Sequence, residues 1–108
     1  MDLSQPDTTA SFAVTVEPDG TTCILVGGEL DTSNADEFRR VVEDAMSDTP
    51  ATVVFDLSEV SFMDSSALAV LLIATRHSAR VHVRQPSPIV RQVIEITGLA
   101  QVLGMQPA

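Results

Sequence analysis

The residues of this chain best placed for chemistry are Asp64-Ser65-Ser66, where an extended apolar segment meets a strongly apolar helix. Aspartate is preferred immediately before a helix, because its side-chain oxygen accepts hydrogen bonds from the free N–H groups of the first turn. Ser65 and Ser66 then occupy the first two helical positions, near the positive end of the helix dipole. We expect a hydroxyl group there to face solvent, where another protein can reach it, modify it and recognise the change.

The surroundings of the two serines disfavour catalysis. A nucleophile elbow requires Gly-x-Ser-x-Gly, and no glycine flanks Ser65 or Ser66. The only histidines are His77 and His82, and twelve residues of helix place His77 about 18 Å from Ser65. A serine nucleophile needs a base within hydrogen-bonding reach. We therefore interpret both histidines as surface or helix-end residues, and we predict that the chain is not an enzyme.

No cofactor and no metal are predicted. The glycine patterns of phosphate-binding loops, G-x-G-x-x-G and G-x-x-x-x-G-K-[ST], do not occur. Glu29, Asp31, Asp56 and Asp64 could gather at one edge of a sheet and attract a hard cation such as Mg²⁺. Their spacing specifies no ligand set, however, and solvated carboxylates and helix caps explain them more simply. Cys23 lies in an apolar strand, where a buried, unreactive thiol is expected.

Composition restricts the class of protein. A chain of 108 residues is long enough for one domain with a single core. A lone cysteine cannot form an internal disulfide, which favours a reducing, cytoplasmic setting. The first ten residues lack the apolar core of a signal peptide. The longest apolar run, residues 67–74, is too short to cross a bilayer, so we expect no membrane partner.

The charge is strongly negative and unevenly distributed. The formal net charge is −9; residues 1–64 hold 14 acidic residues and two arginines, whereas residues 65–108 hold one acid and four arginines. Because neutralisation of phosphates dominates the affinity for nucleic acid, an acidic chain without lysine is a poor candidate for that role. We interpret the acidity chiefly as a source of solubility.

Short strands and helices alternate along the chain. The first two strands, 11–16 and 22–27, are joined by Pro18-Asp19-Gly20, whose residue types suit a tight turn and predict a hairpin. Two more strands are expected at 52–56 and 81–84, with a loop over 57–63 in which Val60 and Phe62 point inward. Residues 28–31 are expected to leave the sheet, and 99–105 to form a short closing strand or a turn.

Three helices are expected between and after these strands. The first begins at a cap on Thr32 or Ser33 and runs to about residue 46 with a helical stripe of apolar residues. The second, from 65 to about 76, is apolar nearly all round, so one side packs on the sheet and another is open to a partner. The third follows Ser87-Pro88 and ends at Gly98, as proline at a helix start and glycine after its end favour.

The order β-β-α-β-α-β-α-β predicts an α/β domain over residues 11–108, preceded by a flexible arm at 1–10. Strands separated by helices pair in parallel through right-handed crossovers, and the hairpin adds an antiparallel edge. The sheet is therefore mixed and four- to five-stranded, with the helices packed on it. Functional loops of such sheets gather at the carboxyl ends of the strands, where Asp31 and Asp64 both lie.

The chain resembles the STAS family, in particular the bacterial anti-sigma-factor antagonists, over residues 11–105. The resemblance is most specific at Val53-Val54-Phe55-Asp56-Leu57-Ser58-Glu59-Val60-Ser61-Phe62-Met63-Asp64-Ser65-Ser66-Ala67-Leu68, and it extends to Gly28-Glu29-Leu30-Asp31 and Thr97-Gly98-Leu99. It implies a protein that binds an anti-sigma factor which is also a serine kinase holding ATP, and thereby frees a sigma factor for transcription. The kinase phosphorylates the serine after the motif aspartate, and a serine phosphatase reverses the reaction.

Carried onto this chain, the resemblance places phosphorylation on Ser65, with Ser66 as second choice. It places partner binding on six residues: Asp31, Asp64, Ser65, Ser66, Ala67 and Leu68. Ala67 and Ala69 stand where the family commonly has glycine, which we expect to affect the choice of partner through a methyl group of Ala67 on the docking surface. The resemblance leaves the oligomeric state open between a monomer and a weak dimer.

A second hypothesis is a STAS subunit that joins a transporter or a signalling assembly without being phosphorylated. Binding that does not respond to ATP would distinguish it from the antagonist. An enzyme is the third hypothesis, and turnover of a small ester or nucleotide by the purified chain would favour it.

Overall fold

The computed structural model describes residues 10–78 and 80–106. The elements are β1 (Ser11–Val16), β2 (Thr22–Leu30), α1 (Ala35–Met46), β3 (Thr52–Met63), α2 (Ser65–His77), β4 (Arg80–Arg84) and α3 (Pro88–Thr97). The α/β class and the order of these seven elements are as predicted. The arm expected at 1–10 lies outside the described residues, apart from Ala10, which packs partly buried against the core.

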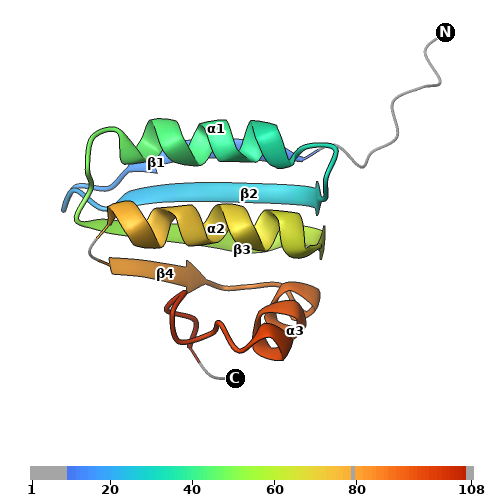
Figure 1. Ribbon diagram of the computed structural model, residues 1–108. Helices are drawn as coiled ribbons and strands as arrows, with labels where there is room; N and C mark the ends of the chain where they lie inside the picture. Colours follow the sequence, from blue (N-terminus) through green and yellow to red (C-terminus); the bar gives the residue numbers. More distant parts are fainter. Residues whose placement is uncertain (1–9, 79, 107–108) are drawn as a thin grey trace, which may run out of the picture.

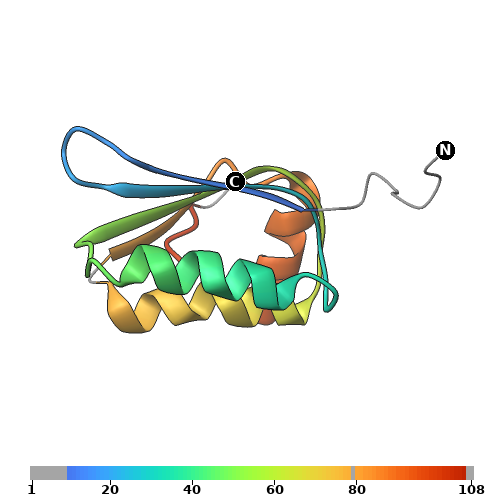
Figure 2. The same ribbon diagram turned by 90° about the horizontal axis from the view of Figure 1, so that it is seen from above.

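The strands form one mixed sheet in the order β1-β2-β3-β4. β1 pairs antiparallel with β2, and β2, β3 and β4 run parallel. Figures 1 and 2 show α1 and α2 side by side over one face of the sheet, with α3 near the end of that face. Within residues 10–78 and 80–106, no helix covers the opposite face. Residues 100–104 form turns rather than a strand, so the described sheet has four strands.

The core lies between the helices and the covered face of the sheet. Side chains that alternate along the strands, such as Ile24, Phe55 and Leu57, are fully buried, as the two-residue period of a strand requires. On α1, Phe38 is also fully buried and stacks on Phe12 of β1 with ring centroids 5.4 Å apart. These contacts hold β1, β2 and β3 against the helix layer.

Two predicted boundaries are wrong, because β2 and β3 are both longer than expected. Residues 28–30 do not leave the sheet, and 57–63 is not a loop: these segments pair with each other. The register shifts twice, between Leu25 and Gly27 and between Gly28 and Glu29, and each shift gives β3 one extra residue. Such shifts break the alternation of apolar and polar residues that a strand prediction uses. Phe62 is consequently 44 % exposed instead of pointing inward.

The helix ends follow local rules, with one exception. α3 begins with Pro88 and ends at Gly98, which has a φ of 77°, as predicted. α1 does not begin at a cap on Thr32 or Ser33; the residue before it is Asn34, whose side chain does not cap the helix. The Pro18-Asp19-Gly20 turn forms as predicted, with the Gly20 N–H donating to the Glu17 carbonyl at 2.8 Å.

The C-terminal segment covers the edge of β4. Leu103 is fully buried and Met105 is nearly so. Between them, Gly104 has a φ of 63°, and a Cβ there would lie 2.1 Å from the Val81 carbonyl oxygen. Glycine is therefore required at this position by both the backbone conformation and the space.

Candidate functional site

The carboxyl ends of β2 and β3 meet at one edge of the sheet. Leu30 and Met63 are paired, and the Asp64 N–H donates to the Leu30 carbonyl oxygen at 3.2 Å. Each strand is followed immediately by an aspartate, Asp31 after β2 and Asp64 after β3. The structure thus brings the two predicted aspartates to neighbouring positions, and Ser65 follows directly as the first residue of α2.

Asp64 is the N-cap of α2, as predicted. Its backbone is extended, and its Oδ1 accepts from the backbone N–H groups of Ser66 at 2.9 Å and Ala67 at 3.4 Å. These bonds satisfy two donors that have no partner inside the helix. The cap fixes the point at which the chain turns from strand to helix, and so fixes the position of Ser65.

The two serine hydroxyls are in different situations. The Ser66 hydroxyl donates to Asp64 Oδ1 at 2.5 Å, and the residue is partly buried. Ser65 is exposed, and no hydrogen bond of its hydroxyl is found among the described residues. The hydroxyl of Ser65 is therefore accessible to another protein, whereas the hydroxyl of Ser66 is held against the cap.

Asp31 belongs to a short ordered loop before α1. Its Oδ1 accepts from the Ser33 N–H at 2.9 Å and from the Ser33 hydroxyl. The bond from the hydroxyl, followed by that from the backbone N–H, lowers the pKa of Asp31 below its ordinary value of 3.8. Asn34 links the loop to the sheet: its Oδ1 accepts from the Asp31 N–H at 3.1 Å, and its Nδ2 donates to the Glu29 carbonyl at 2.7 Å.

Ala67 and Leu68 do not lie on the surface. Their exposed fractions are 1 % and 5 %, and both belong to the main core cluster. The expectation that the Ala67 methyl group is presented to a partner is therefore corrected: the side chain lies in the core. Ala69, the second alanine at a position where glycine is common, is exposed instead.

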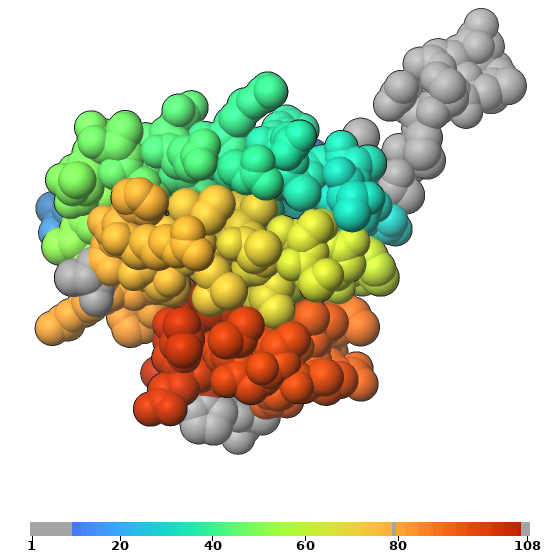
Figure 3. All heavy atoms as spheres, in the orientation of Figure 1, coloured from blue at the N-terminus to red at the C-terminus, as the bar shows by residue number. Residues whose placement is uncertain are grey.

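The outer side of α2 forms a continuous surface strip, defined here by Ser65, Ala69, Leu72, Ile73 and Arg76. The first, second and last of these are exposed and the other two half-buried. In the space-filling view the side chains of α2 lie at the surface between those of α1 and α3 (Figure 3). The strip begins at Ser65 and runs along the helix to Arg76.

Phe62 was not recognised from the sequence as a surface residue. It is paired with Glu29 close to the two aspartates, and its exposure is unusual for a phenylalanine. Only the register shift in β3, which requires knowledge of the pairing with β2, puts it outside the core. No pattern in the sequence itself signals it.

The other residues weighed for chemistry do not converge on Ser65. His77 is exposed at the far end of α2, with its Nδ1 3.0 Å from the Ile73 carbonyl oxygen. Cys23 is buried, and desolvation raises the pKa of its thiol, which makes it a poor nucleophile. Over residues 10–78 and 80–106, no three His, Cys, Asp or Glu side chains are grouped so as to hold a metal ion. In the same residues, no helix has the length and apolar character needed to span a bilayer.

The chain belongs to the STAS-domain family, whose family model matches residues 12–108. Its relatives include the anti-sigma-F factor antagonist RsfB of Mycobacterium tuberculosis, which is 30% identical over 101 residues, covering 90% of this chain and 80% of RsfB. An anti-sigma factor antagonist from Mycobacterium paratuberculosis has a similar crystal structure, with a TM-score of 0.78, 28% identity, and coverage of 98% of this chain and 92% of that one.

The anti-sigma factor antagonist SpoIIAA is also similar, and it has been solved in two forms. The unphosphorylated form has a TM-score of 0.72 and 27% identity, and the match covers 91% of this chain and 88% of SpoIIAA. The phosphorylated form, from Bacillus, has a TM-score of 0.63 and 26% identity, with 91% of each chain covered. The α/β fold predicted from the sequence is thus the fold of this family.

Proposed function

We propose that this chain is an anti-sigma-factor antagonist that binds an anti-sigma serine kinase and is released when that kinase phosphorylates Ser65. A serine phosphatase restores the binding form. The observation that carries the proposal is the exposed hydroxyl of Ser65 at the capped start of α2. The relatives support it, since they are named as antagonists, and one of them is known in phosphorylated and unphosphorylated forms.

The hydrogen bonds favour Ser65 over Ser66 as the acceptor of the phosphoryl group. A kinase must place the attacking hydroxyl in line with the γ-phosphate of ATP. The Ser66 hydroxyl would first have to give up its bond to Asp64 and leave a partly buried position. The Ser65 hydroxyl is exposed at the corner and requires no such rearrangement.

A phosphate on Ser65 is compatible with the folded domain. It would lie at the N-terminus of a helix of 13 residues, where backbone N–H groups and the helix dipole favour an anion. The phosphorylated chain therefore stays folded, and phosphorylation changes the charge of the surface around Ser65.

The same phosphate opposes binding of a partner that fits the unmodified corner. It adds about −1.5 to −2 charges beside the carboxylates of Asp64 and Asp31. Against an acidic group of the partner at ~5 Å, with an effective dielectric constant of ~20, one unit of like-charge repulsion amounts to about 3 kcal/mol, or roughly a hundredfold in affinity. Repulsion of this size converts a stable complex into a transient one.

The strip on α2 is the surface we assign to the kinase. It begins at Ser65 and continues through the exposed Ala69 to two half-buried apolar residues, Leu72 and Ile73. Since Ala67 is buried, the alanine that can influence the choice of partner is Ala69. Asp31, at the end of the neighbouring strand β2, lies beside the start of this strip.

The test uses the unmodified protein to capture its partner from the native cell, followed by reaction of the purified pair with ATP. We expect incorporation of one phosphate, mapped to Ser65 by mass spectrometry, and dissociation of the complex. Ser65→Ala is expected to bind and remain bound, and Ser66→Ala, the matched control, to behave like the unmodified chain. Phosphate found elsewhere, or a complex that ATP leaves intact, contradicts the proposal; the second outcome supports an interaction subunit that is not phosphorylated.

A further inference from the structure

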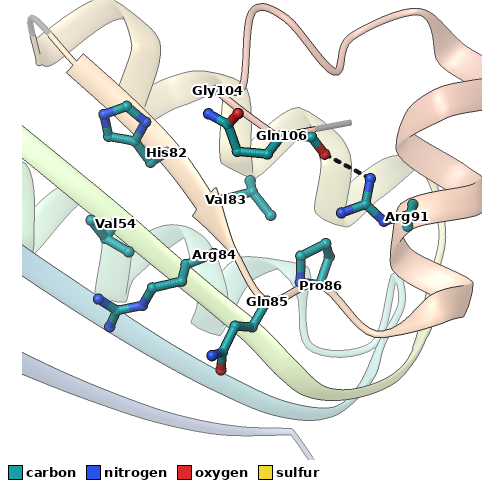
Figure 4. Close-up of a pocket in the computed structure, with 9 residues that line it drawn as sticks. All are labelled: Val54, His82, Val83, Arg84, Gln85, Pro86, Arg91, Gly104 and Gln106. Carbon is teal, nitrogen blue, oxygen red and sulfur yellow. Dashed lines mark hydrogen bonds between the residues drawn. The ribbon is translucent and has the colours of Figure 1, made fainter. Parts of the chain in front are cut away.

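A cavity of about 410 Å³ opens beyond the carboxyl end of β4, away from the Ser65 corner. Figure 4 shows its walls, which come from Val54 on β3, from residues 82–86 of β4 and the following loop, and from α3 and the C-terminal segment. It shares no residue with the α2 strip or with the two aspartates. Its volume falls within the range of sites that bind small molecules.

The charge of the lining is opposite to that of the chain. The protein has 15 acidic residues and a net charge of −9, yet none of the described residues that line the cavity is an aspartate or a glutamate. The lining does include Arg84 and Arg91, which are two of the six arginines of the chain. A local excess of positive groups on an acidic protein attracts anions.

Arg91 is the arginine best placed to contact a ligand. Its side chain is 23% exposed, and both of its described contacts use Nη1, which donates to the Gln106 carbonyl oxygen at 2.7 Å and lies 3.6 Å from Glu95 Oε2. In Figure 4 the bond to Gln106 holds the guanidinium at the wall of the cavity. The other donors of a guanidinium fork suit a carboxylate or a phosphate.

Arg84 contributes charge from farther away. Its guanidinium extends across the sheet toward Val54 (Figure 4). There Nη2 lies 3.3 Å from Cys23 Sγ, and Nη1 lies 3.7 Å from Glu17 Oε2. Its charge is partly offset by Glu17, as that of Arg91 is by Glu95; because both terminal nitrogens of Arg84 are engaged on the side of Cys23 and Glu17, we do not assign it a direct contact.

The remaining walls are suited to an apolar group. Val54 and Val83 are nearly buried, and Pro86 closes the lining on the side of the loop. At the same loop Gln85 has a φ of 51°, an unfavourable conformation for a residue with a side chain, and one found preferentially at functional sites. The cavity therefore combines an apolar surface, a cationic fork and a strained polar residue.

We propose that this cavity binds a small organic anion, in which a carboxylate or phosphate monoester group is attached to an apolar body. The anionic group contacts the guanidinium of Arg91, and the apolar body lies against Val54 and Pro86. The site is separate from the Ser65 corner, so the chain carries a ligand site in addition to its proposed partner surface.

The test measures binding of benzoate and phenyl phosphate by NMR titration of the full chain, with the neutral isostere benzamide as the control ligand. We expect saturable binding of at least one of the two anions, with shifts centred on residues 82–86 and Arg91, and no saturation by benzamide. No saturation by either anion up to about 10 mM, a range that includes weak fragment binding, overturns the proposal. Equal binding of benzamide also overturns it, because the cationic fork would then contribute nothing.

Variants test the role of Arg91 with a matched arginine elsewhere. Arg91→Met keeps an unbranched stem but removes the charge, and it is expected to weaken binding of the anion about tenfold or more. Arg91→Lys keeps the charge but lacks the planar guanidinium, and its affinity for the anion is expected to lie between those of the unmodified chain and Arg91→Met. Arg40→Met, at an exposed arginine of α1, should change the affinity little; a loss equal to that of Arg91→Met would show only a general charge effect. An NMR spectrum of each variant is recorded before the titration to confirm that the variant is folded.

Discussion

The chain leaves the sheet by two neighbouring corners that begin alike and end differently. After the paired residues Leu30 and Met63, the next residue is an aspartate in both strands. At the β3–α2 corner Asp64 caps the helix directly. At the β2–α1 corner Asp31 accepts hydrogen bonds from Ser33, and α1 begins only after Asn34, whose side chain bonds back to Glu29.

The difference shows how the length of a connection decides what a residue does. α2 is joined to β3 by the single residue Asp64, so its first side chain, Ser65, lies at an exposed corner whose backbone is fixed by the cap. A helix that starts later leaves room for a loop, and the equivalent aspartate then stabilises that loop. The same residue type at equivalent strand ends thus positions the proposed phosphorylation site in one case and stabilises a turn in the other.

The largest expected effect is the difference in partner affinity between a negative charge placed at one corner and the same charge placed at the other. Ser65→Asp is expected to weaken binding of the proposed kinase roughly a hundredfold, because a partner that fits the uncharged hydroxyl must repel or desolvate the new charge. Ser33→Asp, the matched change at the other corner, is expected to cost about fivefold or less, as for an exposed surface charge. Titration calorimetry measures both. Equal losses for the two variants would show that the corners are equivalent for binding.

The next effect concerns stability. Asp64→Ala removes the acceptor of two backbone N–H groups and of the Ser66 hydroxyl, and it is expected to lower the free energy of unfolding by about 1–2 kcal/mol. Urea denaturation measures this loss. Asp64→Asn, which retains a capping oxygen, should recover most of it. If Asp64→Ala leaves the free energy of unfolding unchanged, the helix start is held by packing rather than by the cap.

Asn34→Ala is expected to have a smaller effect, about 1 kcal/mol, because it removes two partly buried hydrogen bonds, one within the loop to Asp31 and one from the loop to Glu29 of β2. Loss of protection of the Asp31 amide in hydrogen exchange should accompany it. The control is Ser33→Ala, which leaves both Asn34 bonds in place. A larger cost for Ser33→Ala than for Asn34→Ala would assign the order of this loop to the aspartate instead.

The smallest expected effect is the pH dependence contributed by Asp31. Because hydrogen bonds from Ser33 lower the folded-state pKa below 3.8, the carboxylate contributes stability above its unfolded pKa, and this contribution is lost as the pH falls through the folded value. Asp31→Asn is expected to flatten the decline in stability between about pH 5 and about pH 3 slightly. Denaturation midpoints at the two values measure it, and an unchanged or steeper decline would contradict the assignment.

The sequence predicts the features that depend on one residue and its near neighbours. The Asp64 cap, the Pro18-Asp19-Gly20 turn and the Gly98 helix end are of this kind, because each follows from the conformations and hydrogen bonds that one residue type favours. The exposed Ser65 follows from the cap. The class of fold then follows from the alternation of strands and helices.

Features that depend on pairing could not be predicted in this way. The two extra residues in β3 are visible only once β2 lies beside it, so the length of both strands and the exposure of Phe62 were missed. α2 is apolar nearly all round, and its composition does not say which side faces the core. For that reason Ala67 was expected on the surface, which Ala69 occupies instead.

The bond from the Asp64 amide to the Leu30 carbonyl has a further consequence for any enzyme that modifies this corner. The side chains of Ala67 and Leu68, which follow Ser65 and Ser66, are buried, so little of the linear motif is accessible at the surface. An enzyme that modifies this corner must therefore recognise the folded shape formed by the ends of β2 and β3 and the start of α2. A synthetic peptide spanning 58–72 would lack that contour. Only folded domains would accordingly be modified, and unfolded or incompletely synthesised copies would not be.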